Sequence, residues 1–162
     1  AVLAQVDRYM LFEGGAVVHT GEMVLQADEA TAYFGEEKTA LERLELQGRA
    51  NVRSSNGTLR EMRADEATLL FEQTTRQPEG TVLVGHARIE LAGHDAEQGS
   101  QIDASTMDIA LTPSGRDVMA LDATGGVTLR LPKRRPLSVF IFIFPRTLLN
   151  KSSQITCFRA LF

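Results

Sequence analysis

The segment LQADEATAYF at Leu25–Phe34, followed after a polar break by LERLELQGRANV at 41–52, decides the fold. In the second segment, from Leu44 to Val52, the residues alternate strictly between a small or apolar side and a polar side, which is typical of a strand with one buried face. The first segment also alternates, but the phase of the alternation changes in its middle. Because a change of phase sends side chains to the opposite face of a strand, we predict a β-bulge or a corner at Asp28 and Glu29.

Both segments recur along the chain. The first returns as MRADEATLLF at 62–71 and as IDASTMDIAL at 102–111, each with the same change of phase. The glycine-containing part of the second returns in step, as LQGRANV at 46–52, LVGHARIEL at 83–91, LDATGGVTLRL at 121–131 and, in an incomplete first copy, MLFEGGAVV at 10–18. Two strands per repeat, over about three and a half repeats, are typical of a repetitive β architecture.

We therefore predict an all-β fold, a repetitive antiparallel β-jellyroll that forms one domain over residues 1–131. Sequences that favour turns separate the expected strands: SSNG at 54–57, QPEG at 77–80 and TPSG at 112–115. Helix is expected to be nearly absent, since the period of two persists through every repeat.

The end of the chain differs from the repeats in charge and in composition. All 21 Asp and Glu residues precede Pro132, whereas 6 of the 17 Lys and Arg residues follow it. The tail also contains LSVFIFIF at 137–144, which resembles an aggregation-prone strand. We predict that residues 132–162 are an irregular tail outside the repeat fold, disordered or non-native. A basic and apolar segment that lies on a membrane surface is the alternative.

The acidic repeat region and its few aromatic residues argue against nucleic acid as a partner. The single cysteine, Cys157, excludes a disulfide within the chain. Residues 1–10 do not combine a basic start with an apolar core, and no run approaches the roughly 20 apolar residues of a membrane helix. We expect that a signal peptide or an inner-membrane anchor is absent from this chain.

Little in the sequence is typical of catalysis. Paired acidic residues occur at Asp28–Glu29 and Asp65–Glu66, but they recur with the repeat, whereas an active site occurs once. The scattered His19, His86 and His94 are interpreted as solvated side chains rather than metal ligands. Nucleotide-binding, hydrolase and metalloprotease motifs are absent from the sequence. We predict that the protein is not an enzyme and has no catalytic residue, metal site or cofactor.

The inward face of the expected strands is the candidate site. It is wholly apolar and rich in Ala and Gly, so it predicts either a lengthwise hollow or a solid core in which alanines face larger residues. The residues expected to line this interior are Phe12, Val18, Leu25, Ala32, Phe34, Leu46, Ala50, Val52, Ala67, Leu69, Phe71, Leu83, Ala87, Ile89, Ile109, Val127 and Leu129.

The repeated A-D-E-A-T, followed by an alternating strand and G-x-A-x-V, resembles the OstA-type repeat of the lipopolysaccharide-export proteins LptA and LptC of Gram-negative bacteria. The resemblance covers about residues 10–131, and the third copy departs from it with Ser105 and Thr106 in place of Asp and Glu. It implies an open β-jellyroll in the periplasm whose apolar interior binds the acyl chains of lipid A. It also implies end-to-end strand stacking with other OstA-like transport proteins.

We therefore expect a periplasmic carrier or bridge component in outer-membrane biogenesis, which binds lipopolysaccharide through its acyl chains and passes it toward the outer membrane. The outward arginines Arg43, Arg49, Arg53 and Arg88 are expected to be solvated or to contact the lipid head group. The alternative is a structural β-repeat module that binds only proteins, since such a module would show the same alternation.

Overall fold

The computed structural model of the protein describes residues 2–4, 8–20, 22–35, 40–72, 77–93, 99–112, 114–131 and 157–161, with backbone alone for the first and last segments. Every regular element in these segments is a strand. The strands are β1 (Val2–Ala4), β2 (Tyr9–Thr20), β3 (Met23–Phe34), β4 (Leu41–Ser54), β5 (Leu59–Phe71), β6 (Pro78–Leu91), β7 (Ser100–Leu111), β8 (Val118–Thr124), β9 (Thr128–Arg130) and β10 (Cys157–Leu161). The predicted all-β class is confirmed.

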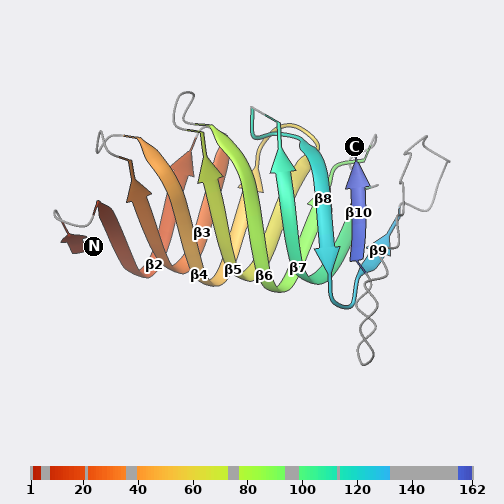
Figure 1. Cartoon of the computed structure of the whole chain (residues 1–162), viewed down its shortest axis with the longest axis horizontal. Coiled ribbons are helices and arrows are strands. Elements are labelled where there is room, and N and C mark those ends of the chain that lie inside the picture. Colours follow the sequence, from red (N-terminus) through yellow and green to blue (C-terminus); the bar gives the residue numbers. More distant parts are fainter. Residues whose placement is uncertain are drawn as a thin grey trace.

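The strands form a single antiparallel sheet in which each strand from β1 to β7 pairs with the next strand in the sequence. The order is β1-β2-β3-β4-β5-β6-β7-β8-β10, and β9 lies off this path and pairs with β7 (Figure 1). This meander follows from the two-strand repeat, because each copy adds a hairpin to the edge left by the copy before it.

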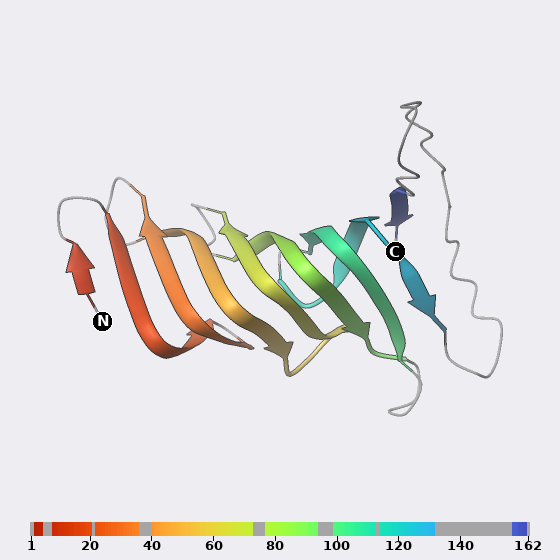
Figure 2. The same cartoon turned by 90° about the horizontal axis from the view of Figure 1, so that it is seen from below.

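Each long strand bends near its middle, and the bends line up along one side of the sheet (Figures 1 and 2). The ladder of paired residues is interrupted at the same level in β2 through β7. The bend divides the sheet into two walls that face each other. The first wall comprises residues 9–13, 29–34, 41–47, 66–71, 78–84, 106–111 and 118–124, and the second comprises 16–20, 23–27, 50–54, 59–64, 87–91, 100–104 and 128–130.

The bend is made by a bulge in the glycine strand. Gly48 and Arg49 together lie opposite the single residue Asp65, and both have a positive φ, 71° and 51°. The same arrangement occurs at Gly85 and His86, with φ of 77° and 46°. The bulged strand keeps its phase, since Leu46 and Ala50 on either side of the bulge are both buried. The phase change lies in the strand opposite the bulge, where Ala64 and Ala67 on either side of Asp65 are both buried. The predicted corner at Asp28 and Glu29 is confirmed, but its extra residue belongs to the neighbouring glycine strand.

The hydrophobic core lies between the two walls. Leu46, Leu69 and Leu83 of the first wall and Leu25 and Ile89 of the second are at most 1% exposed. They belong to one apolar cluster with buried side chains from β2 through β8. Burial of each such side chain stabilises the fold by about 1.5–3 kcal/mol, so the facing walls stabilise one another.

The connections agree with two of the three expected turns. The segments 55–58 and 114–117 join β4 to β5 and β7 to β8. The turn expected at QPEG is wrong, because β6 begins at Pro78 and Gly80 is paired with Leu70. Proline fits the first position of a strand, since its missing N–H is not needed there. The division at residue 131 stays a prediction; β10, within the expected tail, pairs with β8.

Candidate functional site

The structure brings all the predicted interior residues together in one apolar cluster between the walls. The buried ones are Leu25, Ala32, Leu46, Ala50, Val52, Ala67, Leu69, Phe71, Leu83, Ala87, Ile89 and Ile109, and the partly buried ones are Phe12, Val18, Phe34, Val127 and Leu129. Their assignment as lipid-binding residues stays a prediction.

The interior differs between its middle and its two ends. In the middle, Met62, Leu69 and Met107 are 0% exposed, so no water-sized opening reaches them in this conformation. The partly buried apolar side chains lie on β2, β3 and the start of β4 toward one end of the sheet and around β9 at the other. The cluster is therefore closed in its centre and exposes apolar surface toward both ends.

The alanines of this interior gather at the bend. Ala50 and Ala87 directly follow the glycine bulges, and Ala67 lies two residues past the corner residue Asp65. All three alanines are at most 2% exposed. Because the walls converge toward the bend, small side chains fit there and larger ones fit farther out. The alanine-rich composition thus reflects the closed angle between the walls, which the alternation by itself did not indicate.

The outer faces of the two walls carry different charges. The outward acidic residues of the first wall are Glu13, Glu29, Glu45, Glu66, Asp108 and Asp122. The outward charged residues of the second wall are Arg53, Arg60, Arg63, Arg88 and Arg130 together with Glu61, Glu90 and Asp103. The acidic excess of the repeat region is therefore concentrated on the first wall, and the second has slightly more basic than acidic residues.

Glu61 is the centre of an ion-pair network on the second wall. Its side chain is 11% exposed and accepts hydrogen bonds from Arg53 at 2.8 Å, Arg63 at 2.6 Å and Asn51 at 2.9 Å. Burial by itself would raise the pKa of Glu61, but the hydrogen bonds from these three side chains outweigh it and hold the pKa below its usual range.

The arginines expected to be solvated or to contact a head group are all ion-paired. Arg43 lies 3.2 Å from Glu45, Arg88 lies 2.5 Å from Asp103, and Arg49 pairs with Asp28. Arg53 belongs to the Glu61 network. These pairs are partly exposed, so each contributes little to stability, but they neutralise charges that a phosphate group would otherwise meet.

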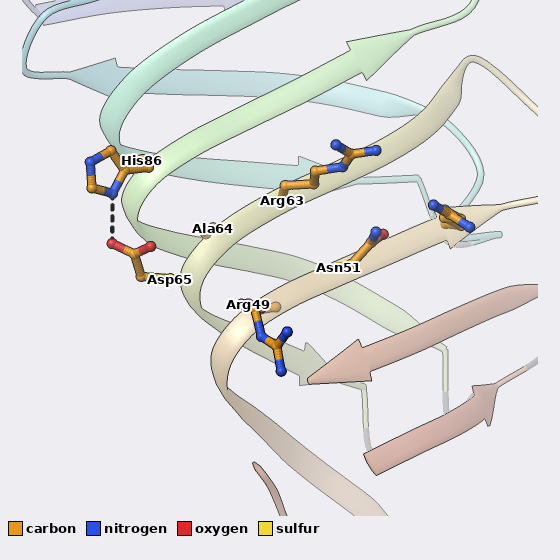
Figure 3. A pocket seen from close by; sticks show the side chains of 8 residues that line it. Arg49, Asn51, Arg63, Ala64, Asp65 and His86 are labelled. Carbon is orange, nitrogen blue, oxygen red and sulfur yellow. Dashed lines mark hydrogen bonds and ion pairs between the residues drawn. The ribbon is translucent and has the colours of Figure 1, made fainter. Parts of the chain in front are cut away.

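A shallow pocket of about 500 Å³ lies on the outer side of the bend (Figure 3). Arg49, Asp65 and His86 line it at the bend, and Asn51 and Arg63 come from the second wall. His86 Nδ1 lies 2.8 Å from Asp65 Oδ2. The charged groups of the pocket are thus largely paired with one another or with neighbouring side chains. Within the described ranges, no group of three or more His, Cys, Asp and Glu residues could hold a metal ion.

The fold is a single bent antiparallel sheet with an apolar interior and ion-paired charges on its outer faces. These features define a β-jellyroll repeat protein whose candidate site is its core. A family model described as LptA/(LptD N-terminal domain) LPS transport protein matches residues 1–114, well over half of the chain. The chain belongs to this family of lipopolysaccharide transport proteins. Comparisons with curated proteins and with solved structures found no match.

The matched residues include β1 through β7, and the sheet continues past them. β8 pairs with the first-wall half of β7, and β9 pairs with its second-wall half. In the segments that the structure describes, no helix is long and apolar enough to cross a membrane.

Proposed function

We propose that this chain is a periplasmic carrier or bridge component that binds the acyl chains of lipopolysaccharide between its two walls. The observation that carries the proposal is the apolar cluster, which runs from β2 to β9 and reaches partly exposed side chains at both ends. Membership of a lipopolysaccharide transport family supports the same substrate.

The energetics favour recognition of the lipid through its acyl chains. Removing an acyl chain from water is worth about 0.8 kcal/mol for each CH₂ group, so a long apolar interior needs no single decisive residue. The outer face of the first wall is acidic, and Arg53, Arg63 and Arg88 of the second wall are ion-paired. An anionic head group therefore gains little electrostatic binding free energy at either outer face, and we propose that it projects into solvent.

The two ends of the sheet are proposed as contacts with other OstA-like proteins. β1 and β10 end the strand order, and the partly buried apolar residues Phe12 of β2 and Leu129 of β9 lie near these ends. A further jellyroll that added its edge strand there would extend the sheet and the apolar interior together.

Lipid extraction from protein secreted to the periplasm of a Gram-negative host tests the function. The proposal expects co-purified lipopolysaccharide in the mass spectrum and saturable capture of added lipopolysaccharide by the delipidated protein. The protein-only interaction module predicts neither. Absence of lipid in the extract together with absence of saturable capture would favour that alternative.

A further inference from the structure

The turn after β7 reaches from the first wall to the second. Asp117 Oδ1 accepts hydrogen bonds from the backbone N–H of Thr58 at 2.9 Å and from its hydroxyl at 2.8 Å. The N–H of Leu59 donates to the carbonyl oxygen of Arg116 at 3.1 Å. Since residues 55–58 end the second wall and residues 114–117 connect strands of the first, these bonds join the two walls at the side opposite the bend.

A second set of contacts strengthens this junction. Arg116 Nε lies 2.8 Å from Glu22 Oε2, at the β2–β3 connection of the second wall. The carbonyl oxygen of Glu22 also accepts a hydrogen bond from the N–H of Ser55 at 3.2 Å. Three connections of the sheet are thus held together. Two of them belong to the second wall and one to the first.

Apolar side chains from both walls lie beneath the junction. Met23 and Leu59 of the second wall are 4% and 1% exposed, and Val118 of the first is 5% exposed. The backbone at Gly115 lies so near the ring of Pro78 that a Cβ atom there would clash with it, and that Cβ would be 3.6 Å from Met23 Sδ. The turn therefore covers the apolar rim of the interior.

The geometry of the sheet limits how this interior can open. The paired strands continue through the bend, so the walls cannot separate there without breaking strand pairing. The glycine bulges set the bend at one level of the sheet, so the two walls are continuous there and are separate from each other only on the opposite side. The side chains in the middle are fully buried, so a guest acyl chain requires the walls to move apart at the opposite side, where the turn joins them.

We infer that residues 114–117 form a clasp across the opening between the walls, and that the clasp must release Thr58 and Glu22 before an acyl chain can pass sideways into the interior. The inference rests on the proposed function, because it concerns how the same interior is reached. It assigns Asp117 and Arg116 a role in admitting lipid that is separate from binding it.

A reversible lock across the clasp tests the inference. The variant combines Thr58→Cys and Asp117→Cys with Cys157→Ser, which removes the one native thiol. We expect the oxidised protein to lose rapid capture of lipopolysaccharide in stopped-flow measurements, and reduction to restore it. The control pair, Thr106→Cys with Thr124→Cys, links directly paired residues within the first wall. Its oxidation is expected to leave capture unchanged.

A loosened variant tests the inference in the other direction. Asp117→Ala removes the acceptor of both Thr58 hydrogen bonds, so capture should become faster while the circular dichroism spectrum stays that of a β protein. Equal capture rates for the oxidised and reduced lock, or for Asp117→Ala and the natural sequence, would overturn the clasp. Absence of saturable capture by the natural sequence would instead overturn the proposed function, so the two failures can be told apart.

Discussion

The side chain of Asp65 fills the space in front of Gly85: a Cβ atom on Gly85 would lie 2.9 Å from the Cβ atom of Asp65. Gly48 stands in the same relation to Asp28. The corner residue of one strand thus requires glycine on the next strand. This contact explains why the A-D-E-A-T and G-x-A-x-V segments recur in step.

Gly85→Ala is expected to destabilise the protein through this contact. The substitution adds a clash with Asp65 to the strain of a φ of 77°, and together they should cost about 2–4 kcal/mol. Chemical denaturation measures the change in the free energy of unfolding. Gly126→Ala is the control, since Gly126 has a φ of 63° and no atom within 4 Å of an added Cβ. It should cost about 1 kcal/mol from backbone strain alone. Equal losses in the two variants would contradict the role of the Asp65 contact.

Glu61 should make the stability of the protein depend on pH. Its pKa is lower in the folded protein than the ordinary value of 4.5, so its contribution is complete above pH 4.5 and disappears as the pH falls through the lowered pKa. Glu61→Gln should therefore destabilise the protein at pH 7 by about 1–2 kcal/mol, and the difference from the natural sequence should shrink on acidification. Thermal unfolding between pH 7 and roughly pH 3 measures this.

The control for that experiment is Glu66→Gln, on the exposed outer face of the first wall. It should change the free energy of unfolding by about 0.5 kcal/mol or less. A Glu61→Gln difference that stayed constant down to the lowest pH would show that the network does not act through the charge of Glu61.

Ala87→Trp should overpack the closed angle between the walls. Ala87 is 1% exposed and follows directly on the bulge, so an indole ring there should cost about 1–3 kcal/mol or more. Ala110→Trp is the matched control, because Ala110 lies on the outer face of the first wall opposite Gly80 and Ala120. Similar melting temperatures for the two variants would mean that the angle contains unfilled space.

Truncation after Leu131 is expected to leave the melting temperature within a few degrees. Every described side chain of the apolar cluster lies before Pro132, and the removed segment includes β10, which pairs with β8. Circular dichroism and thermal unfolding of the truncated chain check this. Loss of the β spectrum would show that residues 132–162 belong to the fold.

Much of the fold and of the candidate interior could be predicted from the sequence. The alternation identified each long strand, and the change of phase located the bend at Asp28. The alternation also indicated which side chains of each strand point inward, and the structure places them, for example Leu69 and Ile89, in one cluster. These predictions succeed because side-chain direction along a strand is a local property that repeats every two residues.

The sequence by itself thus determined the strands, their bend and their apolar face, while the tertiary structure decided how the two walls meet. Thr58 and Asp117 are 59 residues apart and carry no shared motif, so the clasp could not be foreseen. The same holds for the separation of charge between the walls and for the alanines at their closed angle. Such features depend on the angle and twist between walls, which arise from the packing of every strand together and not from any one of them.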